Sequence, residues 1–308
     1  MKNFYTKTVM GIVVLLTAFA FSSYAQIHST AAGGPWDSTW AWVGSVVPGV
    51  THDVVINGPI YSSNNACNNL IVSTGGSLQN NYYNYTLSVN GDLTNNGTIQ
   101  KYPGVGYLFH LRIHGNITNN GTWSNQYTYL NGPADQHVTC LNDSVFSGYQ
   151  FINENTSGGI VYFDNEARFE NTELRFNNNP AEISTNSTLY LHNGYLYQTV
   201  LTGNGPTSIL HGLGVSNVDA PYIDAVTANN LGIDGAVNIK TVTFNGTVIN
   251  NGILQNDYNT YILTIDDDFI NNGTIENYVG VGYQFITNVY GNITNNGVWD
   301  NTAINFYG

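Results

Sequence analysis

The chain has 308 residues, of which 42% are hydrophobic, 13% aromatic and only 9% charged. Its 20 acidic and seven basic residues give a formal net charge of −13 at pH 7, so we expect no nucleic-acid partner, which would select for clustered Lys and Arg. Disordered chains are usually rich in charge and poor in aromatic residues, whereas this one has 22 tyrosines and 46 asparagines. The composition therefore predicts an ordered protein with many polar, uncharged turns.

Residues 1–25 have the pattern of a cleaved signal peptide. Lys2 and Lys7 precede the apolar run "VMGIVVLLTAFAF", and Ser23 and Ala25 supply small residues before a cleavage site. No later stretch approaches the roughly 18 apolar residues that a membrane-spanning helix needs. The expected location is therefore secreted or at the cell surface, with no transmembrane segment after cleavage.

Residues 26–60 are expected to form an N-terminal cap. They include Trp36, Trp40 and Trp42, three of the five tryptophans in the chain. The open end of a repeat array exposes strand edges and apolar side chains, so a covering segment is needed there.

The rest of the chain is repetitive. Residues 76–125 align with 252–301 without a gap, and 28 of these 50 positions are identical. Within each copy the glycine of "NNG", or its equivalent, recurs in steps of 21 and then 24 residues. Short alternating runs such as "YTLSV" and "TVTF" lie between these turns, which is typical of β-solenoids.

We therefore predict an all-β fold, a right-handed parallel β-helix (β-solenoid) with rungs of about 21–24 residues. A first super-repeat would occupy residues 61–228 and a second, truncated one residues 229–308. Eight rungs of 22 residues would account for the 176-residue offset between the copies. Asn301–Gly308 align with Asn125–Gly132, so the second copy is expected to continue beyond residue 308.

Stacking of the rungs predicts the positions of the apolar and Asn/Gly residues. Both Asn and Gly tolerate positive φ, so "NNG" is expected at corners, and stacked Asn side chains are expected to form ladders. The apolar residues expected inside the coil are Leu87, Val89, Leu93, Ile99, Ile113 and Ile117 in the first copy, and Leu263, Ile265, Phe269, Ile275, Val289 and Ile293 in the second.

A family resemblance follows from the leader and from "WDSTWAWVGSVVPGVTHDVVI", "NNLIVSTGGSL" and "TLSVNGDLTNNGTI". These segments resemble the large surface and secreted β-helix proteins that gliding bacteria export by type IX secretion. The first hundred residues are also similar to the extracellular domain named for its eight glycines. The resemblance implies a bacterial, adhesin-like scaffold whose C-terminal sorting domain, in that family, directs surface attachment.

An enzyme is the alternative, because pectin-lyase-like β-helices include lyases and hydrolases that use basic residues, Ca²⁺ or facing carboxylates. The charge cluster around Arg168 and Arg175 is interpreted as a solvated face of ion pairs. An enzyme would need three carboxylates, or carboxylates plus a base, on one face of consecutive rungs, and a register error of one residue would hide such a cluster. No catalytic residue is assigned.

No metal or cofactor is expected, although Ca²⁺ at Asp266–Asp268 is an alternative. Neighbouring residues of a strand point to opposite faces, so an exposed corner is favoured for this run. His110 and His114 would lie about 13 Å apart on one strand face, too far for one ion. Cys67 and Cys140 could pair in an exported protein, but buried free thiols are preferred.

Recurring tyrosines are the candidate binding residues. Four tyrosines of the first copy, at 82, 85, 102 and 107, recur at 258, 261, 278 and 283. Exposed aromatic rings can stack on sugar rings, and the alternative is that they fill the corners of the rod. The sequence predicts extracellular polysaccharide or a cell surface as the partner, with carbohydrate bound by Tyr102, Tyr107, Tyr278 and Tyr283.

Overall fold

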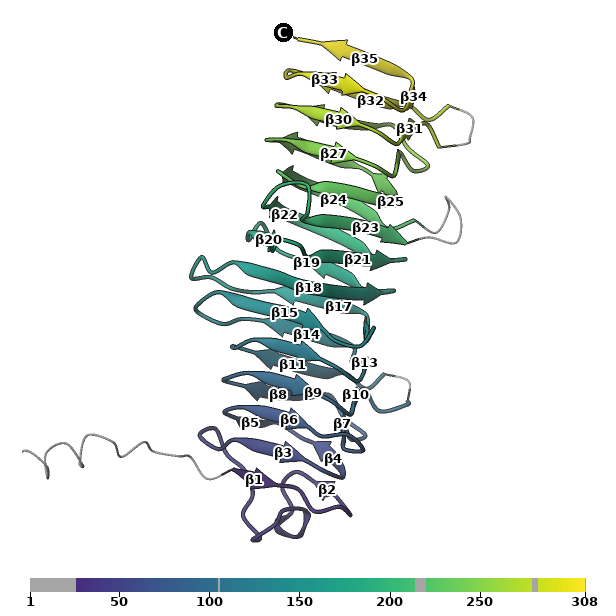
Figure 1. The fold of residues 1–308 in the computed structure, drawn as a ribbon. Helices are drawn as coiled ribbons and strands as arrows, with labels where there is room; N and C mark the ends of the chain where they lie inside the picture. Colours follow the sequence, from purple (N-terminus) through teal and green to yellow (C-terminus); the bar gives the residue numbers. More distant parts are fainter. Residues whose placement is uncertain (1–25, 105, 214–219, 279–281, 308) are drawn as a thin grey trace, which may run out of the picture.

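The computed structural model describes residues 26–104, 106–213, 220–278 and 282–307. The described residues form 35 short strands and one 3-10 turn, η1 (Thr39–Ala41). The strands pair in parallel and join into one continuous sheet that winds into a rod of about 12 turns (Figure 1). The predicted all-β parallel solenoid is therefore confirmed, while the expected signal peptide lies outside the described residues.

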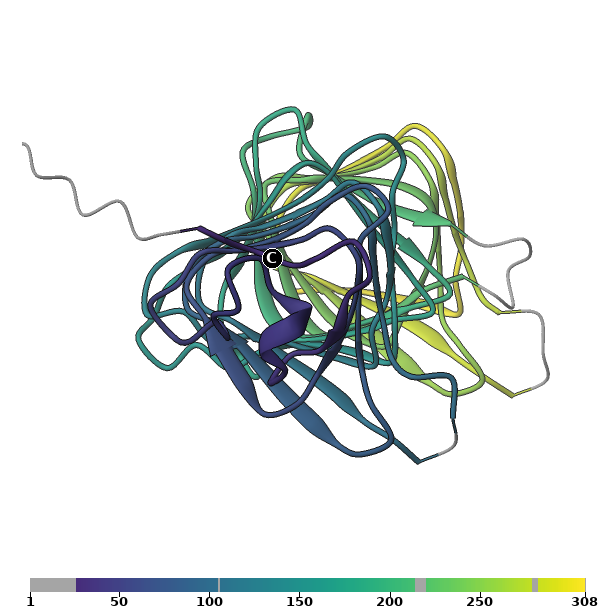
Figure 2. The ribbon, with the colours of Figure 1, turned by 90° about the horizontal axis from the view of Figure 1, so that it is seen from below.

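Each turn of the rod contributes strands to three faces, seen along the rod in Figure 2. Face A consists of β1 (Ile27–His28), β3 (Val54–Ile56), β6 (Leu70–Val72), β9 (Leu93–Asn95), β12 (Ile117–Asn119), β15 (Gln136–Cys140), β20 (Ala181–Ile183), β26 (Thr241–Asn245), β29 (Tyr261–Ile265), β32 (Phe285–Val289) and β35 (Ala303–Phe306). Face B consists of β2 (Gly34–Pro35), β4 (Pro59–Ser62), β7 (Ser77–Asn80), β10 (Thr98–Gln100), β13 (Thr122–Ser124), β16 (Phe146–Ser147), β21 (Thr188–His192), β23 (Ile209–Leu213), β27 (Val248–Asn250), β30 (Phe269–Asn271) and β33 (Ile293–Asn295).

Face C and four bent strands complete the coil. Face C consists of β5 (Asn65–Cys67), β8 (Tyr85–Val89), β11 (Phe109–Ile113), β14 (Tyr127–Leu130), β17 (Gln150–Asn153), β19 (Glu173–Arg175), β28 (Ile253–Gln255), β31 (Thr274–Glu276) and β34 (Val298–Asp300). The strands that bend around a corner and serve two faces are β18 (Val161–Glu170), β22 (Tyr195–Gly203), β24 (Tyr222–Asn229) and β25 (Gly232–Ile239).

The core is a continuous apolar column inside the coil. Alternate residues of each strand point inward, and the predicted interior residues of the first copy are all at most 1% exposed. In the second copy the five residues from Leu263 to Val289 in the predicted set are at most 2% exposed. Ile293 is only partly buried, because no described strand stacks on the outer side of β33.

Inward-facing asparagines form the predicted ladders. Asn95 Nδ2 donates to Asn119 Oδ1 at 2.9 Å, and Asn250 and Asn271 each donate to the next asparagine of their column at 2.8 Å. Asn119 Nδ2 also donates to the carbonyl oxygen of Val145. These bonds satisfy amide groups that would otherwise be buried without partners.

The corner role predicted for "NNG" is correct, but its positive-φ explanation is wrong. None of the three residues has a positive φ in any of the five "NNG" copies, which end at Gly97, Gly121, Gly252, Gly273 and Gly297. Instead, a Cβ at Gly121 would lie 2.2 Å from the carbonyl oxygen of Gly97 in the preceding turn. The same oxygen accepts a hydrogen bond from the Thr122 amide at 2.8 Å. Glycine is required there because two backbones approach closely.

The 176-residue repeat does not equal eight rungs. β8 lies on face C, whereas its equivalent β29 lies on face A, so the offset is eight turns plus one face. Turns of 21 and 24 residues recur within the two copies, as predicted. Elsewhere a turn takes as few as 16 residues (Ala228 to Phe244) or as many as 27 (Leu201 to Ala228).

Replacing Gly121 by alanine is expected to destabilise the protein by about 1–3 kcal/mol, because the new methyl group must displace the Gly97 carbonyl and weaken its hydrogen bond. The matched control is Gly49→Ala, whose Cβ would meet only His52 Nδ1 at 3.7 Å. Denaturant unfolding of the three proteins measures the difference. Equal stability of the two variants would contradict the close-approach explanation.

Candidate functional site

The candidate tyrosines assemble into two clusters at corners of the rod. The first tyrosine cluster consists of Tyr82, Tyr102 and Tyr107, and the second consists of Tyr258, Tyr278 and Tyr283. In the first, the ring centroids of Tyr82 and Tyr102 are 4.7 Å apart and their planes differ by 54°. The equivalent rings of the second are 4.6 Å apart at 53°. The two clusters therefore have the same internal geometry.

Stacking of successive turns creates each cluster. Tyr82 follows β7, and Tyr102 follows β10 in the next turn of the same corner. A fully buried asparagine fixes the second position, since Asn80 Oδ1 accepts a hydrogen bond from the Tyr102 amide at 2.6 Å. Asn256 does the same for Tyr278, also at 2.6 Å.

The most exposed ring of each cluster is one that sequence reasoning did not select. Tyr82 is 56% exposed and Tyr258 is 46% exposed, whereas the four selected tyrosines are half-buried. Tyr82 contacts both selected rings of its copy, and Tyr258 contacts both in the second. The recurrence of Tyr82 as Tyr258 in the repeat could have identified both residues. Their contact with both other rings of a cluster, however, depends on which turns of the rod are adjacent.

Hydrogen bonds between phenols raise the pKa of one tyrosine in each cluster above its ordinary value. Tyr278 Oη donates to Tyr258 Oη at 2.8 Å, and this bond is the main reason that the pKa of Tyr278 is raised to about 12. A hydrogen bond to Tyr82 likewise raises the pKa of Tyr102. The clusters therefore offer neutral rings and hydroxyl groups at physiological pH.

Charged residues beside the tyrosines differ between the clusters. Lys101 precedes Tyr102, whereas the uncharged Asn277 precedes Tyr278. Conversely, Asn81 precedes Tyr82, whereas Asp257 precedes Tyr258. Both clusters therefore have the same three rings, but the charge of the neighbouring residues differs between them.

Basic side chains on the outer faces are held by tyrosines and carboxylates. The guanidinium of Arg168 lies 4.1 Å from the ring centre of Tyr190 and 2.8 Å from Glu166. Arg112 lies over Tyr129 and Arg175 over Tyr197, with carboxylates at 2.6 Å in both cases. The ion pairs expected around Arg168 and Arg175 are present, and cation–π contacts accompany them.

A stack of tyrosine rings runs along face C in the middle of the rod. Tyr195 is nearly parallel to Tyr197 and to Tyr222, with centroid distances of 5.4 and 4.8 Å. The amino group of Lys240 lies 5.0 Å from the centre of the Tyr222 ring. Because these ring faces are covered by each other and by Lys240, we assign them to stabilising the outer sheet.

Face A carries the arrangement of carboxylates and base that an enzyme would need. His137, Tyr162 and Glu182 occupy one outer column in consecutive turns, and Asp164 lies two residues along from Tyr162. His137 Nδ1 is 2.6 Å from Asp164 Oδ2, and the hydroxyl of Ser184 donates to the other oxygen of Asp164. Sequence reasoning missed this group because its members are contributed by three separate turns.

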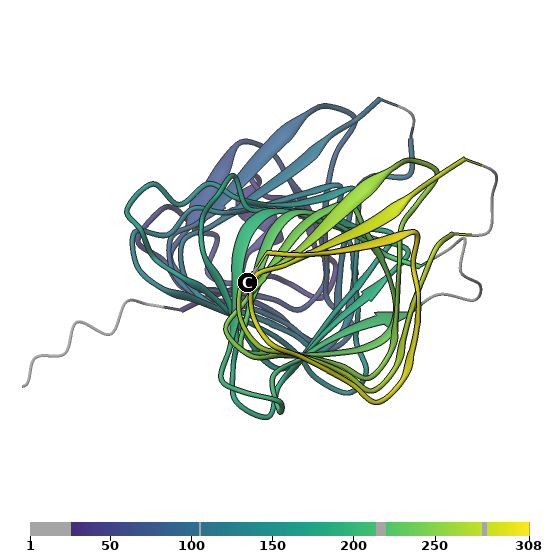
Figure 3. The ribbon, with the colours of Figure 1, turned by 90° about the horizontal axis from the view of Figure 1, so that it is seen from above.

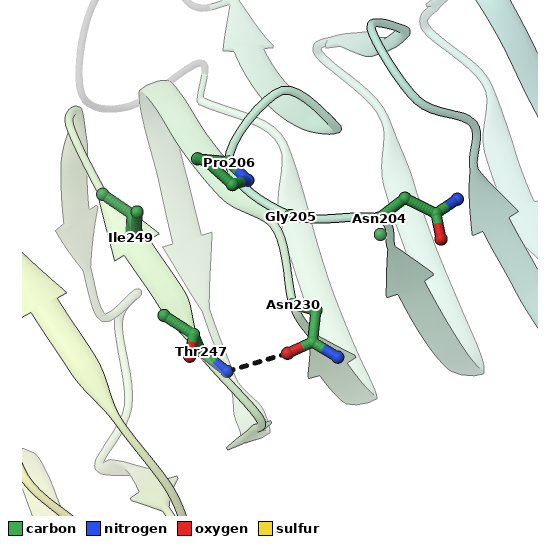
Figure 4. Close-up of a pocket in the computed structure, with 7 residues that line it drawn as sticks. Asn204, Gly205, Pro206, Asn230, Thr247 and Ile249 are labelled. Carbon is green, nitrogen blue, oxygen red and sulfur yellow. Dashed lines mark hydrogen bonds between the residues drawn. The ribbon is translucent and has the colours of Figure 1, made fainter.

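A corner cavity of about 460 Å³ lies where β22 leaves face A (Figure 4). Asn230 Oδ1 accepts a hydrogen bond from the Thr247 amide at 3.0 Å across this corner. Among the residues that the structure describes, none that lines the cavity has a titratable side chain, so these residues offer polar contacts but no general acid or base. The lining residues are Gly203, Asn204, Gly205, Pro206, Asn230, Thr247 and Ile249.

The other candidate metal ligands, Asp266–Asp268 and His110, do not form a metal site in the structure. Asp266–Asp268 are exposed, and Asp268 accepts a hydrogen bond from Asn292 Nδ2 at 2.9 Å. His110 stacks on Tyr127 and bonds the Tyr129 hydroxyl, and its burial lowers its pKa. In the described part of the chain, no three His, Cys, Asp or Glu side chains are grouped so that they could hold a metal.

No family model, curated protein or solved structure matches this chain. Within the residues that the structure describes, no helix has the length and apolar character needed to cross a membrane. The functional argument therefore depends on the geometry of the sites described above.

The two cysteines are buried free thiols. Burial raises the pKa of Cys67 to about 12 and that of Cys140 to about 11. The native thiols are therefore expected to react with a thiol reagent at pH 8 roughly a hundredfold or more slowly than after unfolding, since the thiolate is the nucleophile. Colorimetric titration should count two thiols in denaturant, and the absence of both would reveal a disulfide instead.

Proposed function

We propose that this protein is a secreted or cell-surface structural scaffold that contacts carbohydrate through its two tyrosine clusters. The observation that carries the proposal is a three-ring cluster presented twice with the same geometry. In each copy an exposed ring, Tyr82 or Tyr258, is backed by two half-buried rings. Aromatic rings combine a large apolar face with a polar hydroxyl, which suits the alternating apolar and hydroxyl surfaces of a sugar.

The rod itself supports the scaffold part of the proposal. At about 4.8 Å per turn, about 12 turns extend roughly 60 Å. The turns are tied to each other by parallel ladders, an apolar column and asparagine ladders, so surface groups keep fixed separations. Export is supported by the leader at residues 1–25, and a type IX route and an adhesive role by the resemblance to gliding-bacteria surface proteins.

Removing two rings from each cluster tests carbohydrate binding. The variant Tyr82→Ala/Tyr102→Ala/Tyr258→Ala/Tyr278→Ala is expected to lose at least about tenfold in affinity for a polysaccharide that the native protein binds, equal to about 1.4 kcal/mol. Affinity electrophoresis in gels containing individual polysaccharides measures this loss. Tyr149→Ala is the matched control, because Tyr149 is 55% exposed and lies outside both clusters.

Unchanged mobility of the quadruple variant in every gel that retards the native protein would refute a role for these clusters. Thermal unfolding of both variants should first show that the rod is intact, since the substituted rings lie at corners and outside the apolar column.

A polysaccharide-active enzyme of the β-helix type is the second candidate, favoured by the group of His137, Asp164 and Glu182. If this group is catalytic, native protein should release reducing ends or unsaturated products from a polysaccharide. Asp164→Asn and Glu182→Gln should each slow that release by about a hundredfold or more, as expected for loss of a general acid or base. The exposed Asp266→Asn is the control, and absence of product from native protein would reject the candidate.

A further inference from the structure

The two tyrosine clusters lie on the same side of the rod, although the register assigns them to different corners. The first lies between faces B and C and the second between faces C and A. In Figure 1 the coloured chain segments that directly follow β10 and β31 both leave the rod on the right. The end-on views in Figures 2 and 3 show these two coloured segments extending in nearly the same direction.

Ordinary sheet twist explains how different corners come to the same side. An offset of eight turns and one face requires the rod to rotate by a third of a circle over that distance, or roughly 14° per turn. Adjacent strands in sheets normally twist by about 10–35°. The twist of the rod therefore compensates for the one-face shift of the repeat.

The separation of the clusters follows from the number of turns between them. Slightly more than eight turns at about 4.8 Å give roughly 40 Å along the axis. Because the intervening turns are held in register by parallel pairing and a continuous core, this distance is fixed.

The chemistry shared by the clusters selects a neutral ligand. Lys101 beside the first cluster has no charged counterpart at Asn277, and Asp257 beside the second has none at Asn81. A charged polymer would meet a different local charge at each site, whereas rings and protonated phenols are the same at both. Beyond the leader the chain also carries a net charge of −15, from five basic and 20 acidic residues, which disfavours an anionic chain.

We propose that the two tyrosine clusters are paired subsites that hold one extended, neutral polysaccharide chain along the axis of the rod. This inference depends on the proposed carbohydrate binding and specifies its ligand as a linear chain longer than the separation of the clusters. Binding at one cluster makes binding at the other intramolecular, so a long chain gains affinity without any new contact. A short chain reaches only one cluster and gains nothing.

The test compares two fractions of a linear neutral β-glucan. Chains of the short fraction are shorter than half the cluster separation, and chains of the long fraction are longer than twice that separation. Isothermal titration is carried out on the full chain, on Tyr82→Ala/Tyr102→Ala, on Tyr258→Ala/Tyr278→Ala and on the control Tyr149→Ala. For native protein and the control, the long fraction should bind about 100-fold or more tighter than the short one. In each single-cluster variant this ratio should fall to the small statistical factor due to many equivalent positions on a long chain.

The outcomes separate this inference from the function on which it depends. If native protein binds the short fraction and its long-to-short ratio equals that of the single-cluster variants, the pairing is wrong while carbohydrate binding stands. If native protein binds neither fraction, the proposed binding of this glucan fails together with the pairing. The long fraction is also titrated after carboxymethylation, which makes it anionic. Tighter binding of this anionic form than of the neutral one would overturn the neutral assignment. If a single-cluster variant does not fold, the single substitution Tyr82→Ala or Tyr258→Ala is used in its place.

Discussion

Parallel stacking of the turns in register is the constraint on which the rest of this molecule depends. Each residue of a face lies about 4.8 Å from its counterpart one turn away, so side chains are selected in columns. Where two backbones approach most closely, only glycine fits, as at Gly97 and Gly121. Where an inward position is polar, asparagine succeeds because its amide donates to one neighbour and accepts from the other, as Asn271 does.

The same constraint explains the small number of charged residues. Two like charges stacked at this spacing repel each other by about 1 kcal/mol even in water, and a column would repeat that cost at every turn. Tyrosine and asparagine supply polar surface without the penalty. The few cations are placed between unlike neighbours: Arg168 pairs with Glu166 and Asp143 and lies over Tyr190. A surface with few charged residues and many hydroxyl groups is therefore a consequence of the fold as well as a property suited to sugars.

The alternation of apolar residues and the sequence repeat were sufficient to predict those features that depend on a single turn of the rod. Leu87 and Val89 are two residues apart in a strand, so their common inward direction follows from the period of a strand alone. The one-face offset of the repeat could not be predicted, because it depends on turns of unequal length between Leu201 and Phe244. The central ring of Tyr82 and the proximity of His137 to Asp164 also depend on which turns are neighbours, and local sequence does not contain that information.

The direction of a surface group depends on the number of turns before it and on the twist per turn, and only indirectly on the number of residues. The middle of the rod is made differently from the repeats, with β18, β22, β24 and β25 bending across corners. Its turns nevertheless continue the parallel pairing, and the twist accumulated over them returns the two tyrosine clusters to one side of the rod. The two copies of the repeat are offset by eight turns and one face, not by a whole number of turns. With the twist of the rod, this offset places both tyrosine clusters on one side, as binding of one long, straight partner would require.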